Sequence, residues 1–276
     1  MLPLWRDQVL VVISPTQLNM LRLRGCFGKR QIVSKLSQTL NPPKLNEANW
    51  QPAIDALSTA LKESIWHKAN MKLVISNSLV RYTLLPWSET ILNAEEEQKF
   101  VKHKMNEVFG AAAKNWDISL AANTYGLARL ACAVDSELLI KLRELAAKSY
   151  LDIQSIQPHL ITALNFWQKQ LKGKHLHFLV ADGEKLCTAY IENGQLTSLR
   201  VEQKNEVMTD EMVLSSLQRA ALMNDAVSEM AQAYLFAPKQ ARAISNAGKL
   251  QKTQRLNLPI NYMHNPAAFL AAAHLV

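Results

Sequence analysis

Short hydrophobic runs separated by polar, turn-forming residues occur in the same order twice along the chain. In the first pass they predict three strands, a helix, a strand, a helix, a strand and a helix: residues 8–14, 18–25, 29–36, 49–68, 71–76, 136–149, 151–156 and 159–172. In the second pass the same succession covers residues 175–182, 185–192, 195–201, 208–224, 232–236, 238–249, 253–258 and 266–274. The repeated order predicts two lobes of one architecture.

Each predicted unit begins with three strands joined by tight turns and continues with alternating helices and strands. This order requires a mixed sheet, with antiparallel hairpins first, parallel crossovers after them, and helices over its faces. Two such units side by side are typical of the actin-like (ribonuclease H-like), sugar-kinase-like and heat-shock ATPase class. We therefore expect an α/β fold of duplicated actin-like lobes with mixed sheets.

Residues 77–134 interrupt the first pass and predict a small inserted α+β subdomain. The insertion contains an extended run over 79–85 that stops at Pro86-Trp87, then a helix, then strands over 116–122 and 127–134. Asn93 is expected to cap the helix, with Glu96 three positions later, and Gly110 is expected to end it. The residues that form its apolar stripe are Phe100, Met105, Val108 and Phe109.

Three consecutive acids, Glu95, Glu96 and Glu97, open this helix. Carboxylates near a helix start interact favourably with its positive end. Side chains of adjacent helical residues point in different directions and cannot close on one metal ion. The acidic run therefore indicates a solvated first turn rather than a metal site.

The pattern divides the chain into three parts. We expect a first lobe over residues 1–76 and 135–172, the inserted subdomain over 77–134, and a second lobe over 173–276. Lys172-Gly173-Lys174 marks the boundary between lobes, and Asn41-Pro42-Pro43 marks a loop. Neither stretch is rich enough in glycine or proline to form a flexible linker, so the lobes are expected to pack as one body.

The composition is that of an ordinary globular protein, with 49% hydrophobic and 20% charged residues among 276. No apolar run approaches the roughly 18 residues that span a bilayer, and the first residues lack the basic start and apolar stretch of a signal peptide. We therefore expect a cytosolic protein. Cys26, Cys132 and Cys187 lie far apart without a CxxC pair, which predicts reduced and mostly buried thiols.

The formal net charge of +8 is the one unusual property of the composition. Such a charge favours nucleic acid, an anionic membrane surface or an acidic partner. The basic residues are scattered, and no helix-turn-helix, zinc finger or aromatic-basic RNA signature accompanies them. A membrane surface or an acidic partner is therefore favoured over nucleic acid.

Several short segments carry a family resemblance. They are residues 74–82 (VISNSLVRY), 85–87 (LPW), 130–135 (LACAVD) followed by Leu138 and Leu142, 153–158 (IQSIQP) and 163–165 (ALN). They resemble the actin-like cytoplasmic components of type IV pilus and type II secretion assembly, the PilM and GspL group with its relatives from the mannose-sensitive haemagglutinin pilus. The likeness covers most of the chain in element order, and the insertion lies where that family carries its extra subdomain.

The resemblance implies a cytosolic platform at the inner face of the inner membrane. In the family, such a platform docks a short cytosolic tail of an inner-membrane protein and couples to the assembly ATPase or its neighbours. The tail is seated near the junction of insertion and first lobe, which makes Arg81, Tyr82 and Trp87 the candidate partner-binding residues. A core role is the alternative for Trp87. An exposed sheet edge could also take an extended peptide.

Some members of that group bind ATP between the lobes, with an acid and glycines in the hairpin turns. The family's first turn is similar to Asp-Ile-Gly-Ser-Ser-Ser, whereas this chain has Val12 for the acid, Ser14 for the glycine, and Pro15, which lacks an amide donor. The family's late glycine-rich strand end corresponds to residues 235–238 (LFAP). The second turn keeps Asp182 and Gly183, either as the remnant of a phosphate-binding turn or as a plain hairpin turn.

Other catalytic patterns are missing from the sequence: it contains no GxSxG elbow, Walker loop, HExxH or GxGxxG. His175 and His177 alternate onto one face of a strand, but no third metal ligand is evident nearby. We expect no cofactor, no metal and no catalytic residue, and a non-enzymatic, nucleotide-independent assembly platform. The alternative is an active actin-like ATPase or small-molecule kinase with divergent phosphate turns, and a basic nucleic-acid adaptor is a third possibility.

Overall fold

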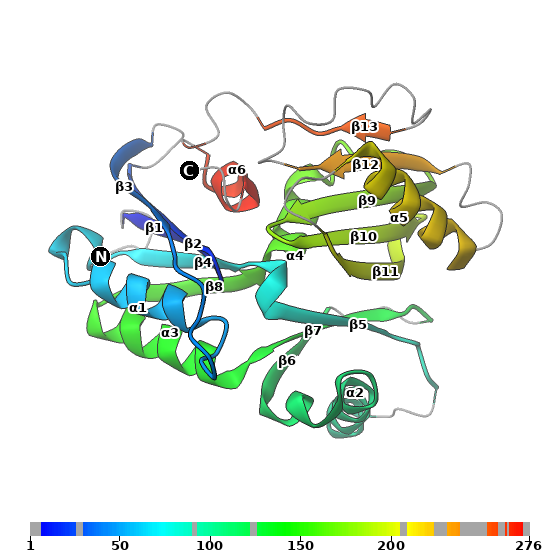
Figure 1. The fold of residues 1–276 in the computed structure, drawn as a ribbon, viewed down its shortest axis with the longest axis horizontal. Coiled ribbons are helices and arrows are strands. Elements are labelled where there is room, and N and C mark those ends of the chain that lie inside the picture. Colours follow the sequence, from blue (N-terminus) through cyan, green and yellow to red (C-terminus); the bar gives the residue numbers. More distant parts are fainter. Residues whose placement is uncertain are drawn as a thin grey trace.

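The computed structural model shown in Figure 1 describes residues 7–25, 30–89, 93–121, 126–204, 209–223, 231–237, 253–258, 263 and 265–272. Their strands form three sheets, two of five strands and one of three. Each five-stranded sheet is the centre of one lobe. The three-stranded sheet belongs to a smaller subdomain, drawn at the bottom of Figure 1.

The first sheet has the strand order β3-β2-β1-β4-β8. Its strands are β1 (Gln8–Ser14), β2 (Gln17–Arg24), β3 (Gln31–Thr39), β4 (Asn70–Ile75) and β8 (Asp152–Pro158). β1 pairs antiparallel with β2 and parallel with β4, as the sequence predicts for hairpins followed by crossovers. Residues of β1 are buried on both sides, because helices cover both faces of this sheet.

The helices α1 (Gln51–Ala60) and α3 (Ser136–Lys148) cover one face of the first sheet, and α6 (Pro266–Ala272) covers the other. Val9, Val11 and Ile13 of β1 point to the side of α1 and α3. The alternate residues Leu10 and Val12 pack against Phe269 and Leu270 of α6. This alternation follows from the two-residue period of a strand.

The second sheet repeats the first, with the order β11-β10-β9-β12-β13. Its strands are β9 (His175–Asp182), β10 (Lys185–Glu192), β11 (Gln195–Gln203), β12 (Gln232–Phe236) and β13 (Thr253–Arg255). Two antiparallel pairs precede two parallel pairs, as in the first sheet. Val213 and Leu217 of helix α5 (Asp210–Met223) pack on this sheet. The fold is therefore a pair of duplicated lobes, as the sequence predicts.

The inserted subdomain consists of a sheet and one long helix. The sheet has the order β5-β7-β6, from β5 (Val80–Leu85), β6 (Trp116–Leu120) and β7 (Arg129–Asp135), all antiparallel. The helix α2 (Ala94–Phe109) is capped by Asn93, whose side chain accepts the Glu96 N–H, and ends at Gly110 with a positive φ. The predicted start and end of this helix, at Asn93 and Gly110, are both confirmed. The apolar stripe differs in one position, because Val101 is buried and Val108 is exposed.

Helix α4 (His159–Trp167) follows β8 and joins the two lobes. It contacts β4 and β8 of the first lobe, β9 of the second lobe, and α6. Trp167 packs edge-on against Phe236 at the end of β12, with 5.4 Å between ring centroids. Because the contacts of α4 reach both sheets, the lobes pack as one body through this helix.

Two predicted helices need comment. The helix expected over 49–68 ends at Ala60 and is followed by a 3-10 turn at Ser64–Trp66, because exposed Lys62, Glu63 and Ser64 precede Trp66, which returns to the core. The helix expected over 238–249 lies outside the described residues, and so does Cys26.

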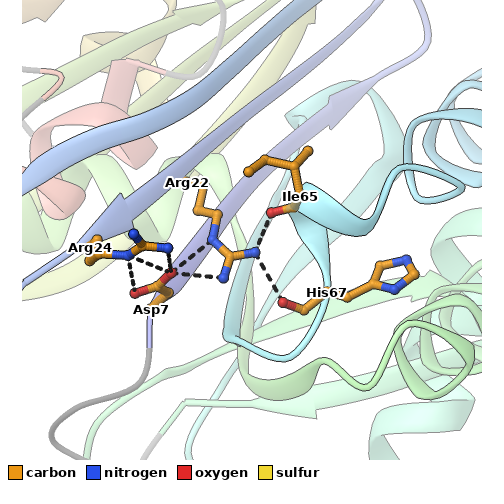
Figure 2. Close-up of polar contacts among 5 residues, drawn as sticks. All are labelled: Asp7, Arg22, Arg24, Ile65 and His67. Carbon is orange, nitrogen blue, oxygen red and sulfur yellow. Dashed lines mark hydrogen bonds and ion pairs between the residues drawn. The ribbon is translucent and has the colours of Figure 1, made fainter.

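Arg22 of β2 fixes the connection between α1 and β4 to the start of the first sheet (Figure 2). Its Nε and Nη2 donate to Oδ2 of Asp7 at 2.9 and 2.7 Å. Its Nη1 donates to the carbonyl oxygens of Ile65 and of His67, the latter at 3.0 Å. Arg24 reaches the same carboxylate from the exposed side. The buried guanidinium therefore has both a counter-charge and carbonyl acceptors, as a buried cation requires.

Candidate functional site

The second hairpin turn, interpreted from the sequence as either a plain hairpin turn or the remnant of a phosphate turn, holds a buried carboxylate. Asp182 ends β9 and is 1% exposed, while Gly183 follows it with φ +56°. Oδ2 of Asp182 accepts the backbone N–H of Asn77 at 2.6 Å. The same oxygen lies 3.1 Å from Nδ1 of His159, which is fully buried. The carboxylate is thus directed into the protein.

Asn77 extends these contacts to the other parts of the molecule. Its Oδ1 accepts the Tyr82 hydroxyl at 2.6 Å and the backbone N–H of Leu160 at 3.0 Å. Asn77 follows β4 of the first lobe, Tyr82 lies in β5 of the inserted subdomain, and Leu160 lies in the first turn of α4. Together with Asp182, we call Asn77, Tyr82 and His159 the junction network. It connects both lobes and the insertion at one point.

Burial around this network raises the pKa of three neutral groups. The pKa of the Tyr82 phenol is well above its ordinary value, first because of burial and then because of nearby Cys187, Cys132 and Asp182. Burial, with Asp182 second, raises the pKa of the Cys187 thiol, and burial raises that of Cys132 to about 12. These groups stay protonated at neutral pH, and Tyr82 remains a hydrogen-bond donor to Asn77.

These shifts predict a loss of stability in alkaline solution. In the unfolded chain the thiols titrate near 9.0 and the phenol near 10.0, so the unfolded state loses protons there while the folded state keeps them. The free energy of unfolding should therefore fall as the pH rises above about 9. Urea unfolding between neutral pH and about pH 11 measures this, and Cys187→Ala should give a shallower fall. A profile that is flat in this window would contradict the burial of these groups.

The first hairpin turn, residues 14–17, contains no carboxylate. Val12, at the position of the family's acid, is buried against α6. Ser14, at the position of the glycine, uses its own side chain to close the turn: its Oγ donates to the Gln17 carbonyl and accepts the Thr16 N–H. The turn is therefore satisfied by its own atoms.

Within the described residues, no three His, Cys, Asp or Glu side chains come together to hold a metal ion. His175 and His177 both contact Tyr190, the former through Nδ1 at 3.1 Å from the hydroxyl and the latter by ring packing at 4.9 Å. His177 is 2% exposed. The two histidines therefore belong to the packing of the second sheet.

A groove with a volume of about 600 Å³ separates the inserted subdomain from the first lobe. The subdomain contributes β6 and the face of β7 that carries Leu130, Cys132 and Val134. The first lobe contributes the ends of β4 and β8 together with α3 and α4. Most of its lining is apolar, and the lining residues from the first lobe are Ile75, Leu139, Arg143, Ile156, Gln157, Pro158 and Ile161.

Two sheet edges border this groove. β8 is the last strand of the first sheet, and β6 is the last strand of the subdomain sheet, so each is paired on one side only within the described sheets. The polar residues of the groove are few: Asp117 and Ser119 on β6, Gln157 on β8 and Arg143 on α3. Arg143 Nη1 lies 3.9 Å from Asp117 Oδ2, an exposed pair. An apolar trough beside unpaired strand edges fits an extended peptide.

The structure does not bring the three predicted partner-binding residues onto one surface. Tyr82 is 9% exposed and its hydroxyl is bound to Asn77, so it is an internal residue. Arg81 is half-buried, and its guanidinium lies over the Trp116 ring at 6.0 Å. Trp87 is half-buried in a small cavity between α2 and the strand ends, lined also by Leu85, Phe100 and Arg129. The groove residues on β6 and α3 were missed, because only the folded chain brings them together.

No protein family model and no curated protein sequence matches the chain. Solved structures do match it. The cytoplasmic domain of EpsL, an inner-membrane component of the type II secretion system of Vibrio cholerae, is similar with a TM-score of 0.58 at 10% identity, over 96% of this chain and 94% of that one. A Bacteroides thetaiotaomicron protein with an actin-like ATPase fold and unknown function is similar with a TM-score of 0.59 at 10% identity, over 97% and 96%.

These likenesses, with the duplicated sheets, define the class: the chain has the actin-like fold. The PilM–PilN type IV pilus biogenesis complex adds a third such structure, with a TM-score of 0.59 at 10% identity over 98% of this chain and 96% of that one. The resemblance to the PilM and GspL group is thus confirmed at the level of the fold. Among the described residues, no helix is both long enough and apolar enough to cross a bilayer.

Proposed function

We propose that this protein is a non-enzymatic platform of a type IV pilus or type II secretion assembly machine. The observation that carries the proposal is the groove between the first lobe and the inserted subdomain, which is apolar and bordered by two strand edges. Its occupant is an extended cytosolic tail of an inner-membrane protein, added as a strand beside β6 or β8. The structures of EpsL and of the PilM–PilN complex, which share the fold, support this assignment.

Localisation follows from the same proposal. A platform that binds such a tail works in the cytoplasm, close to the inner face of the inner membrane. The net charge of +8 favours this position, because anionic headgroups attract basic protein surfaces.

Photo-crosslinking in native cells tests the groove directly. A photoreactive amino acid at Ser119, which is exposed on β6 in the groove, should form an adduct with a single-span membrane protein through its cytosolic tail. The matched control places the same amino acid at Gln38, which is exposed on β3, an edge strand of the first sheet outside the groove. Adducts only with soluble metabolic enzymes, or equal adducts at both positions, would count against the proposal.

A substitution in the groove tests the same proposal by measuring the affinity for the tail peptide. Ser119→Arg places a long charged side chain in the trough, and we expect it to weaken binding of the captured tail peptide by about tenfold or more, as blocking an interface centre does. Gln38→Arg introduces the same side chain elsewhere and should leave the dissociation constant unchanged. Both sites are exposed, so neither change should impair folding.

The proposal includes the absence of nucleotide-driven chemistry. It is supported by the placement of Asp182, which is engaged by Asn77 and His159, and of Val12, which lies in the core. Holding a hydrated magnesium ion would require breaking the junction network. Calorimetric titration with Mg-ATP should show no binding. A low-micromolar affinity would favour the alternative, an active ATPase or small-molecule kinase with divergent phosphate turns.

A further inference from the structure

A second cavity, which shares only Gln157 with the groove among the described lining residues, lies on the α6 side of the first sheet. It has a volume of about 430 Å³ and is formed by β4, β8, α4 and α6, with Arg30 at its border. Its size is within the range of small-molecule sites. Phe166, Pro266 and Leu270 provide an apolar wall. Apart from Ala267, the remaining lining residues carry polar or positively charged side chains.

The charged side chains in the described lining of this cavity are all positive. Lys72 and Arg30 are in its lining, and none of the described lining residues is a carboxylate. Lys72 is half-buried in β4, between β1 and β8, and in the described part of the chain it has no ion pair. Arg30 donates from Nη1 to Oε1 of Gln8 at 2.9 Å, which is a neutral acceptor. A half-buried ammonium that has no ion pair among the described residues favours an anion from solution.

Polar groups around the two cations can complete the coordination of an anion. Ser155 and Gln157 of β8 and Asn165 of α4 are in the lining. Asn265 uses its Oδ1 to accept the N–H groups of Ala267 and Ala268, at 3.0 and 3.3 Å. Since one side of that amide accepts hydrogen bonds from the helix, its NH₂ group is the part left to donate elsewhere.

We propose that this cavity binds the phosphoryl group of a small phosphorylated molecule. A phosphomonoester carries close to two negative charges and three acceptor oxygens, which match two cations with hydroxyl and amide donors around them. The apolar wall receives the organic part of the ligand. The cavity is formed partly by α4 and α6, and α4 also contacts the second lobe, so the ligand binds where the lobes are joined.

The test uses the full chain and pyrophosphate as the probe, at constant ionic strength with chloride as the reference anion. Pyrophosphate should raise the melting temperature of the wild type, because a ligand of the folded state stabilises it by mass action. Lys72→Gln should weaken the dissociation constant measured by calorimetry by about tenfold, the loss expected for one charge-assisted hydrogen bond. The matched control is Lys141→Gln, a half-buried lysine on α3 at the opposite face of the sheet, which should bind as the wild type does.

A second pair of variants avoids any effect on folding. Asn165→Glu adds a negative charge at an exposed position of the cavity, whereas Gln168→Glu adds one at an exposed position just beyond the same helix. Only the first should weaken pyrophosphate binding. Flotation with vesicles of phosphatidic acid, whose headgroup is a phosphomonoester, would support the proposal with a lipid as the source if it is lost in Lys72→Gln and competed by pyrophosphate. No pyrophosphate binding, or equal losses in site and control variants, would overturn it.

Discussion

Replacing Asp182 with alanine is expected to lower the free energy of unfolding by about 2–6 kcal/mol, because two buried groups each lose their polar contact at about 1–3 kcal/mol apiece. The substitution leaves the Asn77 N–H without its acceptor and the fully buried His159 without its carboxylate. This is a large part of the about 5–15 kcal/mol that stabilises a typical domain. Urea unfolding followed by circular dichroism measures the effect.

Glu184→Ala is the matched control for Asp182→Ala, because Glu184 lies in the same hairpin turn but is exposed. Its removal should change the free energy of unfolding by no more than about 0.5 kcal/mol. Asp182→Asn separates charge from hydrogen bonding, since the amide oxygen can still accept the Asn77 N–H. The free energy of unfolding of Asp182→Asn should lie between those of Asp182→Ala and Glu184→Ala. If Asp182→Ala and Glu184→Ala cost the same, the junction network does not hold the lobes together.

Replacing Arg22 with methionine should lower the free energy of unfolding by about 2–4 kcal/mol. The guanidinium is the donor to Asp7 and to the carbonyl oxygens of Ile65 and His67, so its loss leaves partly buried acceptors without this partner (Figure 2). Thermal and urea unfolding give the change. Protease cleavage should also increase first in the segment between α1 and β4, which this side chain fixes.

Arg24→Met provides the control within the same cluster. Arg24 reaches Asp7 at 3.4 Å, but its side chain is 62% exposed, whereas that of Arg22 is 10% exposed. An exposed ion pair contributes less than about 1 kcal/mol. A loss in Arg24→Met as large as in Arg22→Met would show that the carboxylate, rather than the carbonyl contacts, accounts for the stability.

The duplicated architecture could be predicted from sequence because its evidence is local. Alternating and continuous hydrophobic runs mark strands such as β1 and β9, and turn residues such as Asp182-Gly183 separate them. Helix ends were predictable where a cap is present, as at Asn93 and Gly110. The end of α1 was not, because Trp66 has to return to the core after a polar break, which is a tertiary requirement.

The candidate sites could be predicted only in part. The strand register around Val12 and Ser14 could be predicted, and the structure pairs these residues with Asn19 and Gln17 across the first hairpin. The partners of Asp182 were not visible, because Asn77 is 105 residues away in the chain. The groove is likewise composed of β6, β8 and two helices that no sequence motif connects. Tyr82 illustrates the difference: the resemblance singled it out for an external role, and its phenol serves an internal one.

A single oxygen atom, Oδ1 of Asn77, accepts two hydrogen bonds, one from the phenol of Tyr82 in β5 and one from the main-chain N–H of Leu160 at the start of α4. The backbone nitrogen of the same residue is bound to the carboxylate at the end of β9. If the insertion tilts away from the lobes, the hydrogen bond from Tyr82 to Asn77 breaks. The same Asn77 oxygen also binds the first turn of α4. Asn77 therefore couples the position of the insertion to that of the second lobe, in addition to the direct contact of β5 with β11.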